Sequence, residues 1–207
     1  MTNTRCIIVL ARAPVAGQCK TRLIPARGAR GAALLHQRLV RRSVRSAVGT
    51  AAGVELHGTP QAGHGCFLAL RRDHPLQLRR QPHGELGPRM LKALNRALHR
   101  GTAAAVVIGT DCAALTTGDL LAAFEALEGG ADAVLQPAED GGYVLLGLRR
   151  PLAPHALNGV RWSSGCELGQ TLARLRRAAF PRVHLLPTLW DLDRPADLRR
   201  AKRAGLL

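Results

Sequence analysis

Short apolar runs recur along the 207-residue chain, and most of them end at a glycine, a proline or a charged residue. Runs of about four to eight apolar residues, rich in β-branched side chains, are typical of strands buried on both faces. This pattern predicts seven strands, at residues 6–11, 54–57, 76–78, 106–108, 133–136, 144–148 and 184–186. All of these runs are too short to span a membrane.

Longer segments between the strands carry apolar residues at helical spacing. They predict helices at residues 29–48, 66–72, 88–99, 120–127 and 167–175, and a last helix after Asp193. Residues typical of helix starts precede or begin several of them, namely Thr116, Ser163 or Ser164, Asp193, and Pro88 as a first helical residue. Alternating strands and helices predict an open α/β fold. At this length we expect a single domain, residues 1–207.

One strand ends in a sequence that favours ligand binding. The run Val106–Ile108 is followed by Gly109, Thr110 and Asp111. Open α/β folds bind ligands beyond the carboxyl ends of their strands, so Asp111 would project toward that edge. A carboxylate there could bind a divalent metal that carries a phosphate group. The alternative is a turn residue, because aspartate often hydrogen-bonds its own backbone where a strand ends.

The loop after the first strand combines glycine with basic side chains. Backbone N–H groups near Gly17 could bind phosphate oxygens, and Lys20 and Arg22 could neutralise them. The spacing is not that of a Walker loop. The alternative is a pair of solvated basic residues, although lysine is rare in this chain, where only three of the 30 basic residues are lysines.

Two further stretches place charged residues at the ends of elements. Residues 81–90 lead into a helix, where Arg89 and the positive end of the helix would meet a bound anion. Glu139 and Asp140 precede two glycines in a tight connection between two predicted strands. Asp-Gly is also an ordinary hairpin turn. These carboxylates are therefore either catalytic groups or turn residues.

The net charge of +16 first suggests a nucleic-acid partner. The arginines are instead spread along predicted helices, and the few aromatic residues, 3% of the chain, are isolated rather than arranged as stacking platforms. We therefore expect no specific nucleic-acid partner. The acidic residues gather at residues 111–140 and 191–197, which suits a metal cation bound with an anionic substrate.

The five cysteines are odd in number and contain no C-x-x-C pair. This argues against disulfides and a structural zinc site and favours a reducing compartment. The first apolar run is also too short for a signal peptide. We expect a cytoplasmic protein with no membrane contact.

Four stretches together resemble one bacterial family. They are A-P-V-A-G-Q-C-K-T-R-L at 13–23, I-G-T-D-C-A-A-L at 108–115, P-A-E-D-G-G-Y at 137–143 and W-D-L-D-R-P-A-D-L at 190–198. Their order and spacing are similar to those of small GT-A-fold transferases once grouped as a domain of unknown function. These are now often called radical-SAM/selenodomain-associated transferases, and some members are named arsenosugar-biosynthesis glycosyltransferases. The chain departs from the family pattern at Gln136, where glycine is usual, and at Glu85, where aspartate is common.

The resemblance implies a nucleotide-diphospho-sugar transferase fold, with a mainly parallel sheet and helices on both faces. It further implies a metal-dependent transferase that uses a nucleotide-activated donor, Mg²⁺ or Mn²⁺, and a small-molecule acceptor. By analogy with the family, Gly17, Lys20 and Arg22 would bind nucleotide phosphates and Asp111 the divalent metal. From the residues themselves we also expect Ala13 and Arg89 to bind the nucleotide, Asp193 to be a second metal ligand, Glu139 and Asp140 to be catalytic, and Tyr143 and Trp162 to contact the acceptor or the donor sugar.

Several functions remain open at this point. A nucleotide sugar as donor predicts glycosyl transfer. Nucleotidyl transfer from an NTP to a phosphorylated small molecule is the alternative, because the same metal and basic loop would serve it. A nucleotide-binding subunit without catalysis, and a nucleic-acid-binding protein inferred from charge alone, are two further hypotheses. A homodimer is compatible with each.

Overall fold

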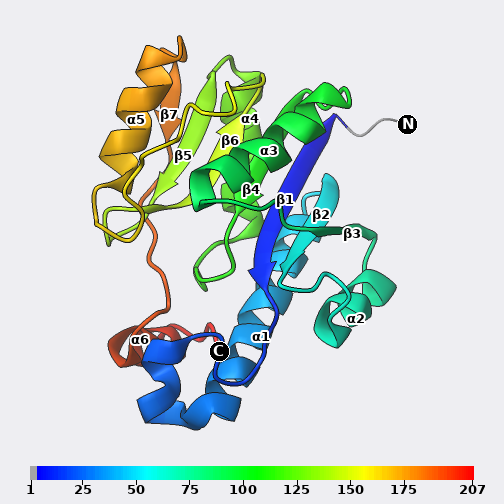
Figure 1. Ribbon diagram of the computed structural model, residues 1–207, viewed down its shortest axis with the longest axis vertical. Coiled ribbons are helices and arrows are strands. Elements are labelled where there is room, and N and C mark those ends of the chain that lie inside the picture. Colours follow the sequence, from blue (N-terminus) through cyan, green and yellow to red (C-terminus); the bar gives the residue numbers. More distant parts are fainter. Residues whose placement is uncertain (1–3) are drawn as a thin grey trace.

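The computed structural model describes residues 4–207, which form one seven-stranded sheet flanked by helices (Figure 1). The strands are β1 (Arg5–Arg12), β2 (Gly53–Thr59), β3 (Leu76–Arg80), β4 (Ala104–Ile108), β5 (Ala133–Pro137), β6 (Tyr143–Leu148) and β7 (Val183–Leu185). Their order in the sheet is β3-β2-β1-β4-β6-β5-β7. β6 is antiparallel to both of its neighbours, and every other pairing is parallel. The predicted α/β fold with a mainly parallel sheet is confirmed.

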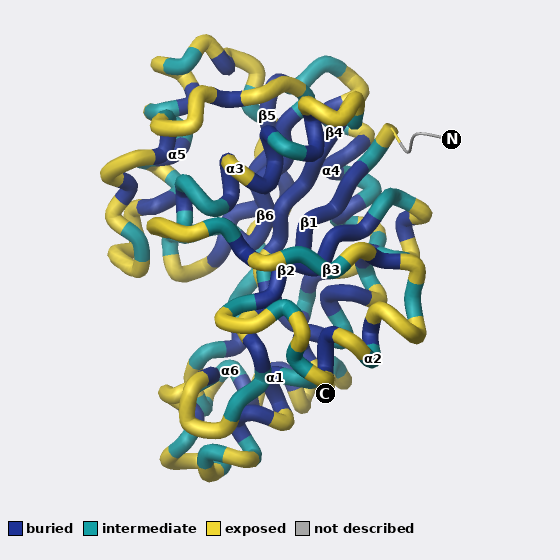
Figure 2. The backbone as a smooth tube through the Cα atoms, turned by 45° about the vertical axis from the view of Figure 1, so that its right-hand side comes forward, coloured by how far each residue is buried: buried dark blue, intermediate teal, exposed yellow. Residues whose placement is uncertain are grey.

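Helices cover both faces of the sheet. On one face lie α1 (Ile24–Val48), α2 (Gly65–Asp73) and α4 (Thr117–Glu128), and on the other lie α3 (Leu86–His99) and α5 (Glu167–Arg177). The central strands are accordingly buried along most of their length (Figure 2). A short 3₁₀ helix, η1 (Thr21–Leu23), leads into α1. At one end of the molecule, α6 (Pro195–Arg203) packs against the first half of α1 (Figure 1).

The predicted cap of α4 is confirmed, whereas three other predicted capping or first helical residues are wrong. Thr116 caps α4 and forms a capping box with Asp119. α3 begins at Leu86, two residues before Pro88. α5 begins at Glu167 after Cys166, so neither predicted serine is its N-cap. α6 begins at Pro195 with Arg194 as its N-cap, so Asp193 is not the cap. Instead Asp197, in the first turn of α6, accepts the backbone N–H groups of residues 193 and 194 through Oδ2.

The parallel strands bring distant segments to one edge of the sheet. β1, β2, β3 and β4 all end there, and the antiparallel β6 begins there. The loop after β1, the Gly109–Asp111 turn and the β5–β6 connection therefore lie close together, although about 120 residues separate the first from the last. Within residues 4–207 we find no helix that is both long and apolar enough to cross a membrane.

Candidate active site

A cleft of about 750 Å³ opens at this edge of the sheet. It is lined by the ends of β1, β2 and β4, by the first turn of α3, by β6, and by the segments that precede α5 and α6. Its charged lining residues are Arg12, Lys20, Arg22, Arg89, Asp111, Asp140, Glu167, Asp191 and Asp193. The cleft lies where open α/β sheets usually bind ligands, beyond the carboxyl ends of their strands.

Lys20 lies at the centre of the acidic part of the cleft. Its Nζ is 2.7 Å from Asp111 Oδ1 and 2.8 Å from Asp193 Oδ1, and it donates a hydrogen bond to the carbonyl oxygen of Leu192 at 2.6 Å. The side chain is only 4% exposed. Burial lowers the pKa of Lys20, but the charges of the two aspartates outweigh it, so the net pKa is raised. The ammonium therefore stays charged and joins the β1 loop to the segment before α6.

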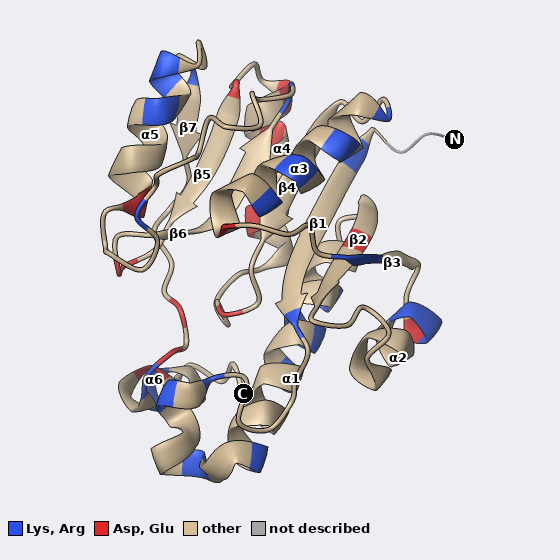
Figure 3. Ribbon diagram, in the orientation of Figure 1, with Lys and Arg blue, Asp and Glu red and all other residues tan. Residues whose placement is uncertain are grey.

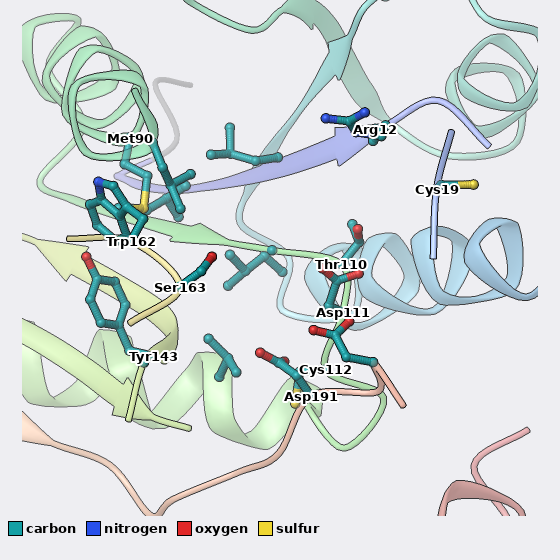
Figure 4. Close-up of a pocket in the computed structure, with 18 of the residues that line it drawn as sticks. Arg12, Cys19, Met90, Thr110, Asp111, Cys112, Tyr143, Trp162, Ser163 and Asp191 are labelled. Carbon is teal, nitrogen blue, oxygen red and sulfur yellow. The ribbon is translucent and has the colours of Figure 1, made fainter. Parts of the chain in front are cut away.

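Asp191 also lies in the cleft, and the sequence analysis did not single it out. Its side chain points toward the same space as Asp111 (Figure 4). Burial, and then the charges of Asp111, Asp193 and Asp140, raise the pKa of Asp191 to about 7. The W-D-L-D sequence does hold a signal for it, because residues 191 and 193 both follow the last strand. The cleft thus holds more carboxylates than the buried Lys20 can neutralise.

This surplus of carboxylates fits a divalent cation. Mg²⁺ is usually held by one or two carboxylates together with water and substrate phosphates. Asp111 is 49% exposed, so part of its carboxylate is accessible from the cleft, and Asp191 lies beside it. Among the described residues, no three His, Cys, Asp or Glu side chains form a ready-made metal site. The residues therefore fit a metal whose coordination is completed by the phosphates of a substrate.

Asp193, the second metal ligand expected from the sequence, has a different setting. One carboxylate oxygen contacts Lys20 at 2.8 Å, and the other lies 3.8 Å from Arg22. Both oxygens therefore face cations of the protein itself. In this arrangement, Asp191 is better placed than Asp193 to share a metal with Asp111.

The opposite side of the cleft is basic. Arg12, at the end of β1, donates to the carbonyl oxygen of Gln18 at 3.3 Å, and Arg89 donates to Gln81 Oε1 at 2.9 Å. Gln81 is fixed in turn, because its amide donates to two backbone carbonyls. Burial and the charge of Arg12 lower the pKa of Arg89. Within residues 4–207 neither arginine forms an ion pair with a carboxylate, which makes this side a suitable place for an anion.

Three of the predicted site residues do not line the cleft. Ala13 is 2% exposed, and its backbone N–H donates to the carbonyl oxygen of Thr59 at 2.7 Å. Gly17 lies in an exposed turn with φ +81°. Glu139 forms a bidentate ion pair with Arg200, at 2.7 and 2.9 Å. This placement argues against Glu139 as a catalytic group, because its carboxylate is already used at the surface.

Two aromatic residues form a wall at the far end of the cleft. The rings of Tyr143 and Trp162 meet edge to face, with centroids 6.2 Å apart and planes at 70° (Figure 4). The Tyr143 hydroxyl oxygen lies 3.4 Å from Thr171 Oγ1, and burial raises its pKa, so the phenol stays protonated. Trp162 packs closely on α3, where a Cβ added to Gly87 would lie 2.9 Å from the indole ring. These side chains are fixed and shape the cleft.

The β5–β6 connection completes this wall. Asp140 Oδ1 accepts a hydrogen bond from the backbone N–H of Gly142 at 2.9 Å, as in an ordinary Asx turn. Gly141 lies directly against the loop before α5, since a Cβ there would be 2.1 Å from the carbonyl oxygen of Gly165. Gln136, which departs from the family pattern, is fully buried and donates to Asp119 Oδ1, so it does not reach the cleft.

Comparison of the sequence with known families gives one match. Residues 44–164, more than half of the chain, match DUF2064, described as an uncharacterized protein conserved in bacteria. The chain belongs to this family. No curated protein matches it.

Solved structures similar to this DUF2064 protein share its fold. A protein from Desulfovibrio desulfuricans G20, provisionally named a nucleotide-diphospho-sugar transferase, is 27% identical with a TM-score of 0.87, covering 98% of this chain and 88% of that one. The 4-diphosphocytidyl-2C-methyl-D-erythritol synthase of Anaerococcus prevotii DSM 20548 is 9% identical with a TM-score of 0.59, and both chains are covered completely. The glucosyl-3-phosphoglycerate synthase of Mycobacterium tuberculosis, in complex with Mn²⁺ and UDP, is 10% identical with a TM-score of 0.53, covering 99% and 77%. The GT-A-like nucleotide-diphospho-sugar transferase fold implied by the sequence motifs is confirmed.

Proposed function

We propose that this DUF2064 protein is a metal-dependent glycosyltransferase that uses a nucleotide sugar and a small-molecule acceptor. The observation that carries the proposal is the arrangement of charges in the cleft. Carboxylates at residues 111 and 191 line the cleft next to a side that carries Arg12 and Arg89 without carboxylate partners. A nucleoside diphosphate with its divalent cation has the matching charges. The similar solved structures named for nucleotide-dependent transfer support this assignment.

The residues divide the work as follows. Arg12, Arg22 and Arg89 bind the diphosphate, and Lys20 holds the β1 loop against the acidic segment. Asp111, with Asp191, would hold Mg²⁺ or Mn²⁺. When bound, the metal would neutralise charge that develops on the diphosphate leaving group. Asp140 lines the cleft on the acceptor side and would take a proton from an acceptor hydroxyl.

Exchange of Asp111 for asparagine tests the metal site. Asp111→Asn keeps the shape of the side chain and removes a hard anionic ligand, so Mn²⁺-dependent binding of a nucleoside diphosphate should fall at least tenfold by calorimetry. Apo stability should change little, because Lys20 keeps Asp193 and the carbonyl oxygen of Leu192. A variant that is destabilised by about 1 kcal/mol, as for a lost turn or cap residue, and still binds Mn²⁺-nucleotide normally would identify Asp111 as a turn residue.

Asp191→Asn and Asp193→Asn form a matched pair for the second ligand. We expect Asp191→Asn to weaken Mn²⁺ binding more than Asp193→Asn, because both oxygens of Asp193 face cations. A larger loss of Mn²⁺ affinity in Asp193→Asn would assign the metal to Asp193. The Lys20–Asp193 ion pair would then have to be shared with the metal or broken when the metal binds.

Nucleotidyl transfer is the second candidate, favoured by the likeness to the 4-diphosphocytidyl-2C-methyl-D-erythritol synthase and to a cytidylyltransferase from Leptospira borgpetersenii. The two reactions differ in their product. A glycosyltransferase releases a nucleoside diphosphate, and a nucleotidyltransferase releases pyrophosphate from an NTP. Incubation with panels of nucleotide sugars and NTPs, followed by detection of each product, separates them, and we expect nucleoside diphosphate.

A further inference from the structure

The cleft has two halves of different chemistry. All four of its lysine and arginine residues, Arg12, Lys20, Arg22 and Arg89, come from the end of β1, the loop after it and α3. The half built by β6 and the loop before α5 contributes no basic side chain to the lining. Its charged members are instead acidic, Asp140 and Glu167. Figure 4 shows this division, with Arg12 on one side and Tyr143, Trp162 and Ser163 on the other.

Glu167 is the least expected member of this half. It is the first residue of α5 and only 6% exposed, yet it lines the cleft. Its Oε1 accepts the backbone N–H of Ser164 at 2.7 Å. Within the described part of the chain, no arginine or lysine forms an ion pair with it. The carboxylate lies at the positive end of α5, and a carboxylate has room for further donors, so a ligand that donates hydrogen bonds can bind to it.

The second acidic group belongs to a turn that packs against the start of α5. Asp140 uses Oδ1 for its own turn, and the turn is fixed by the close approach of Gly141 to Gly165. The backbone N–H of Leu168, in the first turn of α5, donates to the carbonyl oxygen of Gly141 at 3.1 Å. The two carboxylates therefore belong to one interlocked unit of hairpin and helix start. Such a unit can present two acceptors at a constant separation.

The remaining wall suits a ring or carbon chain. Tyr143 and Trp162 present aromatic surface, and Met90 of α3 lies beside the indole (Figure 4). Aromatic surface next to carboxylates is suited to a polyol, because C–H groups pack on the rings while hydroxyl groups donate to the carboxylates. A phosphate or carboxylate on the acceptor would meet two like charges in this half of the cleft.

On the basis of the proposed function, we infer that the acceptor is an uncharged polyhydroxylated molecule, and that Glu167 and Asp140 bind its hydroxyl groups. Glu167 is a specificity residue in this assignment, and it has no part in holding the nucleotide. A phosphorylated molecule would then not be the preferred acceptor. This inference therefore also argues against nucleotidyl transfer to a phosphorylated acceptor.

Tryptophan fluorescence can test this inference directly, because the chain has two tryptophans. Trp190 stacks under the Arg200 guanidinium and does not line the cleft. In a Trp190→Phe background the signal therefore comes from Trp162, in the acceptor half. The probes are matched pairs, namely glucose with glucose 6-phosphate, myo-inositol with its monophosphate, and glycerol with glycerol 3-phosphate. Each is titrated with the nucleoside diphosphate and Mn²⁺ present.

We expect at least one uncharged polyol to give a saturable change, and its phosphate ester to bind at least tenfold more weakly. Glu167→Gln should weaken the polyol by about tenfold, as for a lost hydrogen bond to a charged group, and should reduce the discrimination against the ester. Asp140→Asn, which can keep the turn through its side-chain oxygen, should act in the same direction. Glu125→Gln, on the exposed surface of α4, is the control and should leave both titrations unchanged.

The inference is overturned if a phosphate ester binds more tightly than its parent polyol, or if no uncharged member of the panel gives a saturable response. Calorimetry with UDP, GDP, CDP and ADP in the presence of Mn²⁺ is run on the same preparations. If the protein binds a nucleotide but prefers a phosphate ester to its parent polyol, the acceptor assignment is wrong and the proposed function stands. Absence of binding by all four nucleotides rejects the proposed function on which it rests.

Discussion

At the residue scale, Lys20 neutralises part of the negative charge in the acidic part of the cleft. A buried ammonium bridges Asp111 and Asp193, whose positions differ by 82 residues along the chain. The sequence predicts a basic residue for phosphate in this loop, whereas the structure places its ammonium between carboxylates. The contact joins residues 173 positions apart, and no local pattern reports such a distance. Asp191 follows the last strand in the W-D-L-D sequence, but only the fold shows that it lies near Asp111.

Lys20→Met tests this bridge. Loss of the cation should lower the free energy of unfolding of the apo protein by about 1–3 kcal/mol. The loss should be smaller than for a fully buried pair, because Asp111 and Asp193 are 49% and 40% exposed. Mn²⁺ should then stabilise the variant more than the wild type, because the metal restores the missing positive charge. Chemical denaturation with EDTA or with Mn²⁺ measures both effects. Lys92→Met, on the exposed face of α3, should show neither.

At the scale of elements, the acceptor half depends on the contact between the β5–β6 connection and the start of α5. Gly141 has φ +86°, and a Cβ there would overlap the carbonyl group of Gly165. Gly17 has a similar φ of +81° but open space around it. Gly141→Ala should therefore destabilise the fold by clearly more than Gly17→Ala, whose cost is the left-handed backbone alone, about 1–2 kcal/mol. Equal losses in thermal unfolding would show that the two turns are not interlocked.

A second test at this scale concerns Glu55 on β2. It is 3% exposed and lies between His57 and three arginines, with Arg79 and Arg96 both at 3.0 Å. Burial raises the pKa of Glu55, but hydrogen bonds from His57 and Arg100 and the charge of Arg79 outweigh it and lower the pKa to about 2. Because the folded-state pKa lies below the ordinary value of 4.5, this stabilisation is present above pH 4.5 and is lost as the pH falls toward 2.

Glu55→Gln should therefore lose about 3 kcal/mol at pH 7, and the difference from the wild type should narrow below pH 4.5. Urea denaturation from pH 3 to pH 7 measures this difference. The exposed variant Glu125→Gln provides the comparison. A difference that stays constant across this range would mean that the loss comes from the amide donor facing the arginines rather than from the titrating charge of Glu55.

Elements were predictable from sequence where local chemistry decides them. The apolar runs located all seven strands, and Thr116 with Asp119 caps the start of α4 as predicted. Element ends decided by tertiary contacts were not predictable. α3 begins at Leu86, before Pro88, and the missing side chain at Gly87 lets Trp162 pack closely there. Glu139 is drawn away from the cleft by Arg200 of α6, an ion pair that depends on how the C-terminal segment folds back.

At the scale of the whole molecule, the excess of positive charge is distributed rather than focused. Lysine and arginine side chains occur on helices on both faces of the sheet (Figure 3). Part of this charge is also neutralised locally, because Glu55 and Asp132 each contact three arginines. Where cations do face a common space, in the cleft, they lie beside carboxylates. This distribution suits a small anion with a metal better than the repeated phosphates of a nucleic acid.

The corresponding prediction concerns DNA. We expect only weak, non-specific binding, with a Kd of about 10⁻⁴–10⁻⁶ M at physiological salt, and no preference for sequence or for single strands. Fluorescence anisotropy with labelled duplexes of two lengths and a single strand, in increasing NaCl, measures the affinity and its salt dependence. Binding on the distributed surface should leave the cleft free, so Mn²⁺ with a nucleoside diphosphate should not displace the DNA. Displacement at nucleotide concentrations that saturate the cleft, or a clear preference for one sequence, would place the nucleic acid in the cleft and contradict the reading of the charge as a solvated surface.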